Sequence, residues 1–126
     1  MSVKPTAKTV LVVDDHTFVK AFYTMALKPY NLNLVFAYDG QEAVDRARDT
    51  SPDLILMDIN LPRMDGTEAA RLIRNDPALK DVWIIAVSGR SPEEYGGKSA
   101  GFTQCLKKPI TVEQLRSAIS QYLKLE

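Results

Sequence analysis

Polar side chains follow four apolar runs of this sequence, at the point where each run ends. They comprise three carboxylates, one hydroxyl and one amine: Asp14, Asp15, Asp58, Ser88 and Lys108. If the runs are parallel strands of one sheet, these groups converge at its carboxyl edge, where open α/β sheets hold their ligands. Three clustered carboxylates cannot all stay ionised without a cation, and hard oxygen ligands favour Mg²⁺. The pattern therefore predicts a divalent-metal site.

The elements that must position these groups are strands alternating with helices. Short apolar runs predict strands at residues 10–13, 34–37, 54–57, 82–87 and 104–106. Helical spacing predicts helices that begin near Thr17, Ala43, Asp65 and Thr111. This alternation predicts an α/β fold, a doubly wound (βα)₅ unit with a parallel sheet and helices on both faces.

Length and composition exclude several classes of protein. The 126 residues fit one domain, and 16 basic residues balance 16 acidic ones, so no bulk charge attracts nucleic acid or anionic lipid. One cysteine fits a reducing compartment, and the sequence shows no signal peptide and no run of about 20 apolar residues. We expect a cytoplasmic domain at 9–126 after a polar lead-in at 1–8. We also expect it to stand alone, because Met1 opens the chain and the last predicted helix nearly closes it.

The motifs at the strand ends resemble those of the receiver domain of two-component response regulators. Val13-Asp14-Asp15 is similar to the acidic pair of that family, and residues 54–66 are similar to its phosphoacceptor segment. Ser88-Gly89 and Lys108-Pro109 match its hydroxyl and lysine positions in the same order. The resemblance runs from about Thr9 onward. It implies a flavodoxin-like fold with strand order 2-1-3-4-5, and a cis peptide bond before Pro109.

The resemblance also implies a set of metal ligands. Asp15, Asp58 and the backbone carbonyl of Asn60 would bind Mg²⁺ directly, and Asp14 would act through metal-bound water. The nearby His16 is expected to be a solvated side chain, because Mg²⁺ prefers oxygen.

For phosphoryl transfer, the resemblance implies that Asp58 is the phosphoacceptor, with Ser88 and Lys108 holding phosphoryl oxygens. The donor would be a phosphohistidine on a sensor histidine kinase or a histidine phosphotransfer protein, and hydrolysis would be self-catalysed. Such a chain is a signalling switch and not an enzyme acting on other molecules, and it would be a monomer or a weak phosphorylation-dependent dimer. Asn60 and Arg90, each two residues past a site residue, are expected to flank the phosphoryl group.

Several residues have a simpler structural interpretation. Asp65 is expected to cap a helix together with Glu68, and so lies outside the metal site. Lys107 should face away from the site, because alternation along a strand places it opposite Lys108. Three aromatic side chains are expected in the core: Phe18, Phe22 and Trp83.

Two features depart from the family pattern. Cys105 stands where the family usually has an aromatic residue, and the segment before it is short and contains Gly96-Gly97. The fourth helix should therefore be short or mobile, and activation should mainly rearrange residues 89–101. We expect the output surface to comprise this segment, the fifth strand and the last helix, with Tyr95 and Tyr122 as contacts.

Two other functions compete with the switch. A Mg²⁺-dependent aspartyl phosphatase of the haloacid-dehalogenase type also uses an aspartyl nucleophile, but its Asp-x-Asp motif differs from the adjacent Asp14-Asp15. A flavin-binding module would need a phosphate-binding loop after the first strand. Two aspartates at that position repel phosphate unless a metal intervenes.

Overall fold

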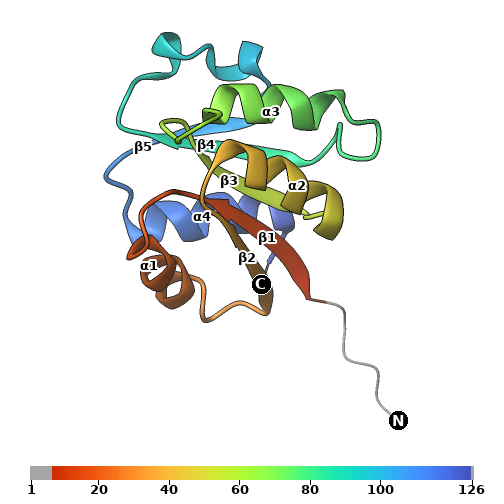
Figure 1. The fold of residues 1–126 in the computed structure, drawn as a ribbon. Helices are drawn as coiled ribbons and strands as arrows, with labels where there is room; N and C mark the ends of the chain where they lie inside the picture. The colour runs from red at the N-terminus through yellow and green to blue at the C-terminus, as the bar shows by residue number, and fades with distance from the viewer. Residues whose placement is uncertain (1–6, 126) are drawn as a thin grey trace.

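Five parallel strands form one sheet at the centre of the molecule. The computed structural model describes residues 7–125 and has the strand order β2-β1-β3-β4-β5 (Figure 1). The strands are β1 (Lys8–Val13), β2 (Leu32–Ala37), β3 (Leu54–Asp58), β4 (Trp83–Ser88) and β5 (Gln104–Lys107). This topology confirms the predicted fold class and strand order. β1 includes Lys8 from the predicted lead-in, of which residues 1–6 lie outside the described part.

Four helices cover the two faces of the sheet. They are α1 (Val19–Ala26), α2 (Gly40–Thr50), α3 (Gly66–Asn75) and α4 (Val112–Leu123). Figure 1 shows α1 and α4 on one face and α2 and α3 on the other. Within residues 7–125, no helix has both the length and the apolar character needed to cross a membrane.

The segment between β4 and β5 carries two short 3₁₀ helices in place of an α-helix. They are η1 (Pro92–Glu94) and η2 (Gly97–Ala100). The expected shortening of the fourth helix is thus confirmed. Gly96 and Gly97 both have positive φ, at 96° and 47°, a conformation that ends a helix and that glycine adopts without strain.

Each face of the sheet has its own apolar core. Along β1, Leu11 and Val13 pack with α2 and α3, whereas Val10 and Val12 pack with α1 and α4. Every residue of β3 is buried. A strand covered on both faces must be continuously apolar, which is why its sequence shows no polar alternation before Asp58.

Helix caps fix where α3 and α4 begin. The Asp65 side chain accepts the Glu68 N–H at 3.0 Å, which confirms the predicted N-cap. Thr111 and Gln114 form a reciprocal capping box at the start of α4. Such caps satisfy backbone N–H groups that a helix end otherwise leaves unpaired.

The expectation that Phe18 and Trp83 are core residues was wrong. Phe18 is 74% exposed because α1 begins only at Val19, which leaves Phe18 as the N-cap. Trp83 is 41% exposed because it opens β4 at the amino edge of the sheet, where its ring packs on Tyr122 at 4.9 Å. Phe22 is half-buried and packs against the α1–α4 core.

Arg74 ties the end of α3 to the loop before β4 and to the residues before β5. Its guanidinium donates to the carbonyl oxygens of Gly101, at 2.9 Å, and Lys80, at 3.0 Å. It also donates to the Val82 carbonyl and the Thr103 hydroxyl. No periodic pattern in the sequence predicts this contact, since an arginine near a helix end is usually solvated.

Glycine at position 66 should be essential for the close packing of α3 against the end of β3. A Cβ at this position would lie 2.2 Å from the Asp58 carbonyl oxygen, whereas one at Gly89 would meet nothing within 4 Å. We expect Gly66→Ala to lower the free energy of unfolding by about 1–3 kcal/mol. Gly89→Ala should change it by less than about 0.5 kcal/mol. Urea unfolding checks both, and equal stabilities of the two variants would contradict the close packing at Gly66.

Candidate functional site

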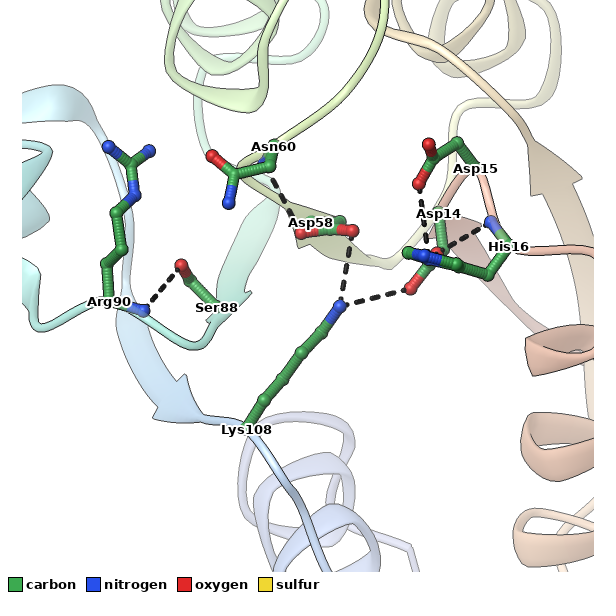
Figure 2. A network of polar contacts seen from close by, with 8 residues as sticks. All are labelled: Asp14, Asp15, His16, Asp58, Asn60, Ser88, Arg90 and Lys108. Atoms are coloured by element: carbon green, nitrogen blue, oxygen red, sulfur yellow. Dashed lines mark hydrogen bonds and ion pairs between the residues drawn. The ribbon is translucent and has the colours of Figure 1, made fainter.

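Three charged side chains from three strand ends meet at the carboxyl edge of the sheet. The Lys108 Nζ lies 3.2 Å from Asp58 Oδ2 and 3.5 Å from Asp14 Oδ2 (Figure 2). Asp14 and Asp58 are only 6% and 4% exposed. Lys107, in contrast, is exposed, as predicted. The lysine directly before Pro109 is therefore the one that reaches the carboxylates.

The register of the sheet explains this convergence. Val13 pairs with Met57 and Asp58 pairs with Val87, so β1, β3 and β4 end at nearly the same level. Beyond β5, the Lys108 N–H donates to the Ser88 carbonyl at 2.8 Å, and the bond from Lys108 to Pro109 is cis, as predicted. When parallel strands end at the same level, the residues that follow them lie close together in space.

Burial dominates the electrostatics of Asp58. Desolvation raises the pKa of its carboxyl above the ordinary value, and the charge of Asp14 raises it further. The Lys108 ammonium and the Asn60 N–H, at 3.3 Å, act in the opposite direction. Because burial is the largest cause, the ionised carboxylate is incompletely compensated by the groups around it. A further cation at this position would stabilise the ionised form of the Asp58 carboxyl.

His16 is exposed, as predicted, and its imidazole also contacts the acidic pair. Its Nδ1 lies 2.9 Å from Asp14 Oδ1 and 3.2 Å from Asp15 Oδ1. Its backbone N–H also donates to Asp14 Oδ1 at 2.9 Å, which folds the loop back over the carboxylate. The hydrogen bond to Asp14 raises the pKa of His16, and the charges of Asp14 and Asp15 raise it further. The sequence did not predict this contact because the turn that creates it leaves no periodic signal.

The oxygen donors gathered here fit a hard divalent cation. One ligand atom from each of Asp14, Asp15, His16 and Asp58 lies within 4.8 Å of the others. Three of these four groups are carboxylates, which suit Mg²⁺ better than zinc. Asp65 is outside this group, and its carboxylate accepts hydrogen bonds from Thr67 and Glu68 instead.

Ser88 and Asn60 complete the opposite side of the site. In Figure 2 they lie on the side of Asp58 away from the acidic pair. Ser88 is fully buried at the end of β4, and its Oγ accepts the Arg90 N–H at 3.1 Å. Figure 2 shows the Arg90 side chain extending from the loop after Ser88, on the side of Asn60 away from the acidic pair.

An open apolar groove of about 650 Å³ adjoins the charged groups. Asp14, His16 and Lys108 line one end of it. Side chains of α1 and of the loop before α4 line the rest: Phe18, Val19, Phe22, Pro109 and Ile110. The sequence did not reveal this groove, because the apolar spacing of Phe18 indicated a core residue. The run Pro109-Ile110, apolar and directly after the site lysine, was the signal that pointed to it.

Comparisons with known proteins agree with this geometry. Protein PilG of Pseudomonas aeruginosa is 32% identical over 116 residues, which cover 90% of this chain and 86% of PilG. The sensor histidine kinase CheAY of Helicobacter pylori is 32% identical over 97% of this chain, although the chain spans only 16% of the length of that kinase.

A solved structure shows the same fold. The receiver domain of the sensor histidine kinase PA1611 from Pseudomonas aeruginosa has a TM-score of 0.85 and 27% identity, covering 94% of this chain and 99% of that domain. It was crystallised with a magnesium ion coordinated in its active-site cleft. The family model of the response regulator receiver domain matches residues 10–120, which include every site residue described above. The chain therefore belongs to the response regulator receiver domain family.

Proposed function

We propose that this chain is a phosphorylation-dependent signalling switch in which Asp58 accepts a phosphoryl group. The observation that carries the proposal is the buried Asp58 carboxylate at the carboxyl edge of the sheet, which the Lys108 ammonium joins to the acidic pair through Asp14. Membership of a phosphoacceptor signalling family supports it. Asp14 also lies buried beside the lysine, at 3.5 Å, but its carboxylate is already engaged by His16, whereas Asp58 is closer to Lys108, at 3.2 Å.

The site also has the donor set for the Mg²⁺ that such transfer requires. Asp15, Asp58 and the Asn60 backbone carbonyl would bind the ion directly, and Asp14 would bind through water. The support is the cluster of carboxylate oxygens in this chain and the magnesium ion in the PA1611 receiver domain. The ion would supply positive charge to the transferring phosphoryl oxygens.

Catalysis by these residues would consist of positioning and charge neutralisation. The Asp58 carboxylate attacks phosphorus, a P–O bond forms, and the P–N bond to the donor histidine breaks. The Lys108 ammonium and the Ser88 hydroxyl would each hold one phosphoryl oxygen as negative charge spreads over all three. Lys108 already reaches Asp58, so it needs to move little to perform this role.

The phosphodonor would be a histidine kinase domain or a histidine phosphotransfer protein. We propose that its histidine-bearing helix docks in the apolar groove beside the site, with an apolar side chain against Phe18 and Phe22. The helix α1 that lines this groove carries Lys20 and is followed by Lys28, and residues 16–37 contain no acidic residue. An amphipathic helix with acidic residues complements such a surface. We place the exchange in the cytoplasm, where the free Cys105 thiol stays reduced.

The output surface proposed here comprises residues 89–101, β5 and α4. Two short 3₁₀ helices replace a regular helix in this segment, and β5 forms an edge of the sheet. Few backbone hydrogen bonds must break for the segment to rearrange. The switch would signal through protein contacts at this surface as a monomer or a weak dimer, and not by binding nucleic acid.

Acetyl phosphate with Mg²⁺ should phosphorylate the chain once, on Asp58. Intact-mass spectrometry should show one added phosphoryl group in the parent and none in Asp58→Asn. Asp39, a half-buried carboxylate that caps α2, provides the matched control, and Asp39→Asn should still be phosphorylated. Full phosphorylation of Asp58→Asn would contradict the assignment.

Mg²⁺ alone should stabilise the fold, because it relieves the repulsion among the clustered carboxylates. At a free concentration of 100 times Kd, binding contributes about 2.7 kcal/mol. The Tm should rise accordingly in the parent and fall back when EDTA removes the ion. Asp15→Ala should lose most of this rise, whereas Asp45→Ala, on the exposed side of α2, should keep it. An equal rise in both variants would place the metal elsewhere.

In the absence of metal, ionisation of Asp58 should weaken the fold. Burial raises the pKa of this carboxyl, so the folded state holds the proton more tightly than the unfolded chain. Its ionisation therefore costs stability as pH rises through that range, and the cost vanishes at lower pH. In EDTA, Asp58→Asn should raise Tm by roughly 3 °C at pH 7 and less at pH 4. A lower Tm at pH 7 would show that Lys108 outweighs burial.

A further inference from the structure

His16 is the only histidine of the chain, and its imidazole lies against the acidic pair (Figure 2). The residue belongs to the loop after β1, where its ring also packs on the ring of Phe18, with centroids 5.7 Å apart. The His16 side chain is 52% exposed, so an ion from solvent can reach it. Phe18 thus supports an accessible imidazole next to the carboxylates of the proposed metal site.

The distances around the His16 Nδ1 atom match those between neighbouring ligands of one cation. Ligands that lie about 2.1 Å from an octahedral ion are about 3 Å from their neighbours and about 4 Å from the ligand opposite. Nδ1 lies 2.9 Å from Asp14 Oδ1 and 3.2 Å from Asp15 Oδ1. One ligand atom of each of these residues and of Asp58 lies within 4.8 Å of the others. The nitrogen that serves as a hydrogen-bonding atom without an ion is therefore also placed as a ligand.

The loop backbone keeps the imidazole at this position. The His16 N–H donates to Asp14 Oδ1 at 2.9 Å, which closes a turn over the buried carboxylate. Lys108 approaches the other oxygen of Asp14, Oδ2, at 3.5 Å. Because the lysine and the imidazole contact different oxygens, the ring nitrogen can exchange its hydrogen bond for a metal without displacing Lys108.

An imidazole nitrogen distinguishes between classes of divalent ion. Mg²⁺ takes oxygen ligands, whereas Ni²⁺ and Zn²⁺ bind imidazole readily. The three carboxylates suit either class of ion, but the imidazole adds a ligand only for the second class. Coordination needs the lone pair of the ring nitrogen, so a proton held on Nδ1 passes to solvent when the ion binds.

We propose that His16 Nδ1 is a ligand for borderline cations such as Ni²⁺ and Zn²⁺ at the acidic site, and that it does not bind Mg²⁺. His16 thereby sets how strongly these ions compete with Mg²⁺ for the same carboxylates. The inference rests on the metal site of the proposed function. It adds to that site a residue that selects between ions.

The test compares the affinities of the full chain, without a histidine tag, for Mg²⁺, Ni²⁺ and Zn²⁺ by isothermal titration calorimetry. His16→Ala and His16→Gln should each weaken Ni²⁺ and Zn²⁺ binding by at least about ten-fold, the smaller loss typical when even an outer partner of a metal ligand is removed. Their Mg²⁺ affinity should equal that of the parent. Thr17→Ala removes the neighbouring exposed side chain and should bind all three ions like the parent. Asp15→Ala removes a shared carboxylate and should weaken all three.

NMR of the single imidazole shows whether the ring bonds to the ion or only lies near it. With ¹⁵N-labelled chain and ¹¹³Cd²⁺ in place of Zn²⁺, Nδ1 should show a scalar coupling to the metal, which requires a direct bond. Bound ¹¹³Cd²⁺ without this coupling would overturn the inference and leave the proposed function standing. Equal Ni²⁺ affinities of His16→Ala and Thr17→Ala, or an equal loss of Mg²⁺ affinity in His16→Ala, would do the same. A parent chain that binds none of these ions would overturn both.

Discussion

The structure depends on one electrostatic constraint, the placement of a buried carboxylate next to two others at the end of a parallel sheet. Asp58 and Asp14 are nearly inaccessible to water, so ionising both is costly unless positive charge lies close by. In this structure Lys108 supplies that charge between them, and His16 contacts the acidic pair, which raises the pKa of its imidazole. Neither fully offsets the burial of Asp58, whose pKa stays raised. The site therefore holds more buried negative charge than its own side chains neutralise, and a divalent cation would neutralise the remainder.

The rest of the fold can be understood as what keeps those carboxylates in place. β1 and β3 are covered on both faces, so their ends cannot shift without disturbing two cores. Gly66 lets α3 begin directly against the Asp58 carbonyl, and the cap at Asp65 fixes the direction of that helix. These constraints position the site before any ligand arrives. Such preorganisation is what charge stabilisation in a transition state requires.

The sequence predicted the parts of the molecule that follow from strand geometry. Asp14, Asp58, Ser88 and Lys108 were placed together because parallel strands end at one edge, and the observed register bears this out. Phe18 was misplaced because apolar spacing does not reveal the exact residue at which a helix begins. The sequence did not predict the contacts of three other residues, His16, Arg74 and Tyr95. Each of these contacts depends on a loop conformation or on a partner that is distant in the sequence.

Cys105 departs from the family pattern, and its consequence for the switch depends on the residues around it in the structure. Taken alone, the small residue suggests that a switching aromatic is absent. The structure shows that the segment expected to move carries an aromatic residue of its own, Tyr95, whose ring packs edge-on against Phe102. Arg90 contacts the ring with its guanidinium and the Ser88 hydroxyl with its backbone N–H, so a single residue joins this aromatic side chain to the site.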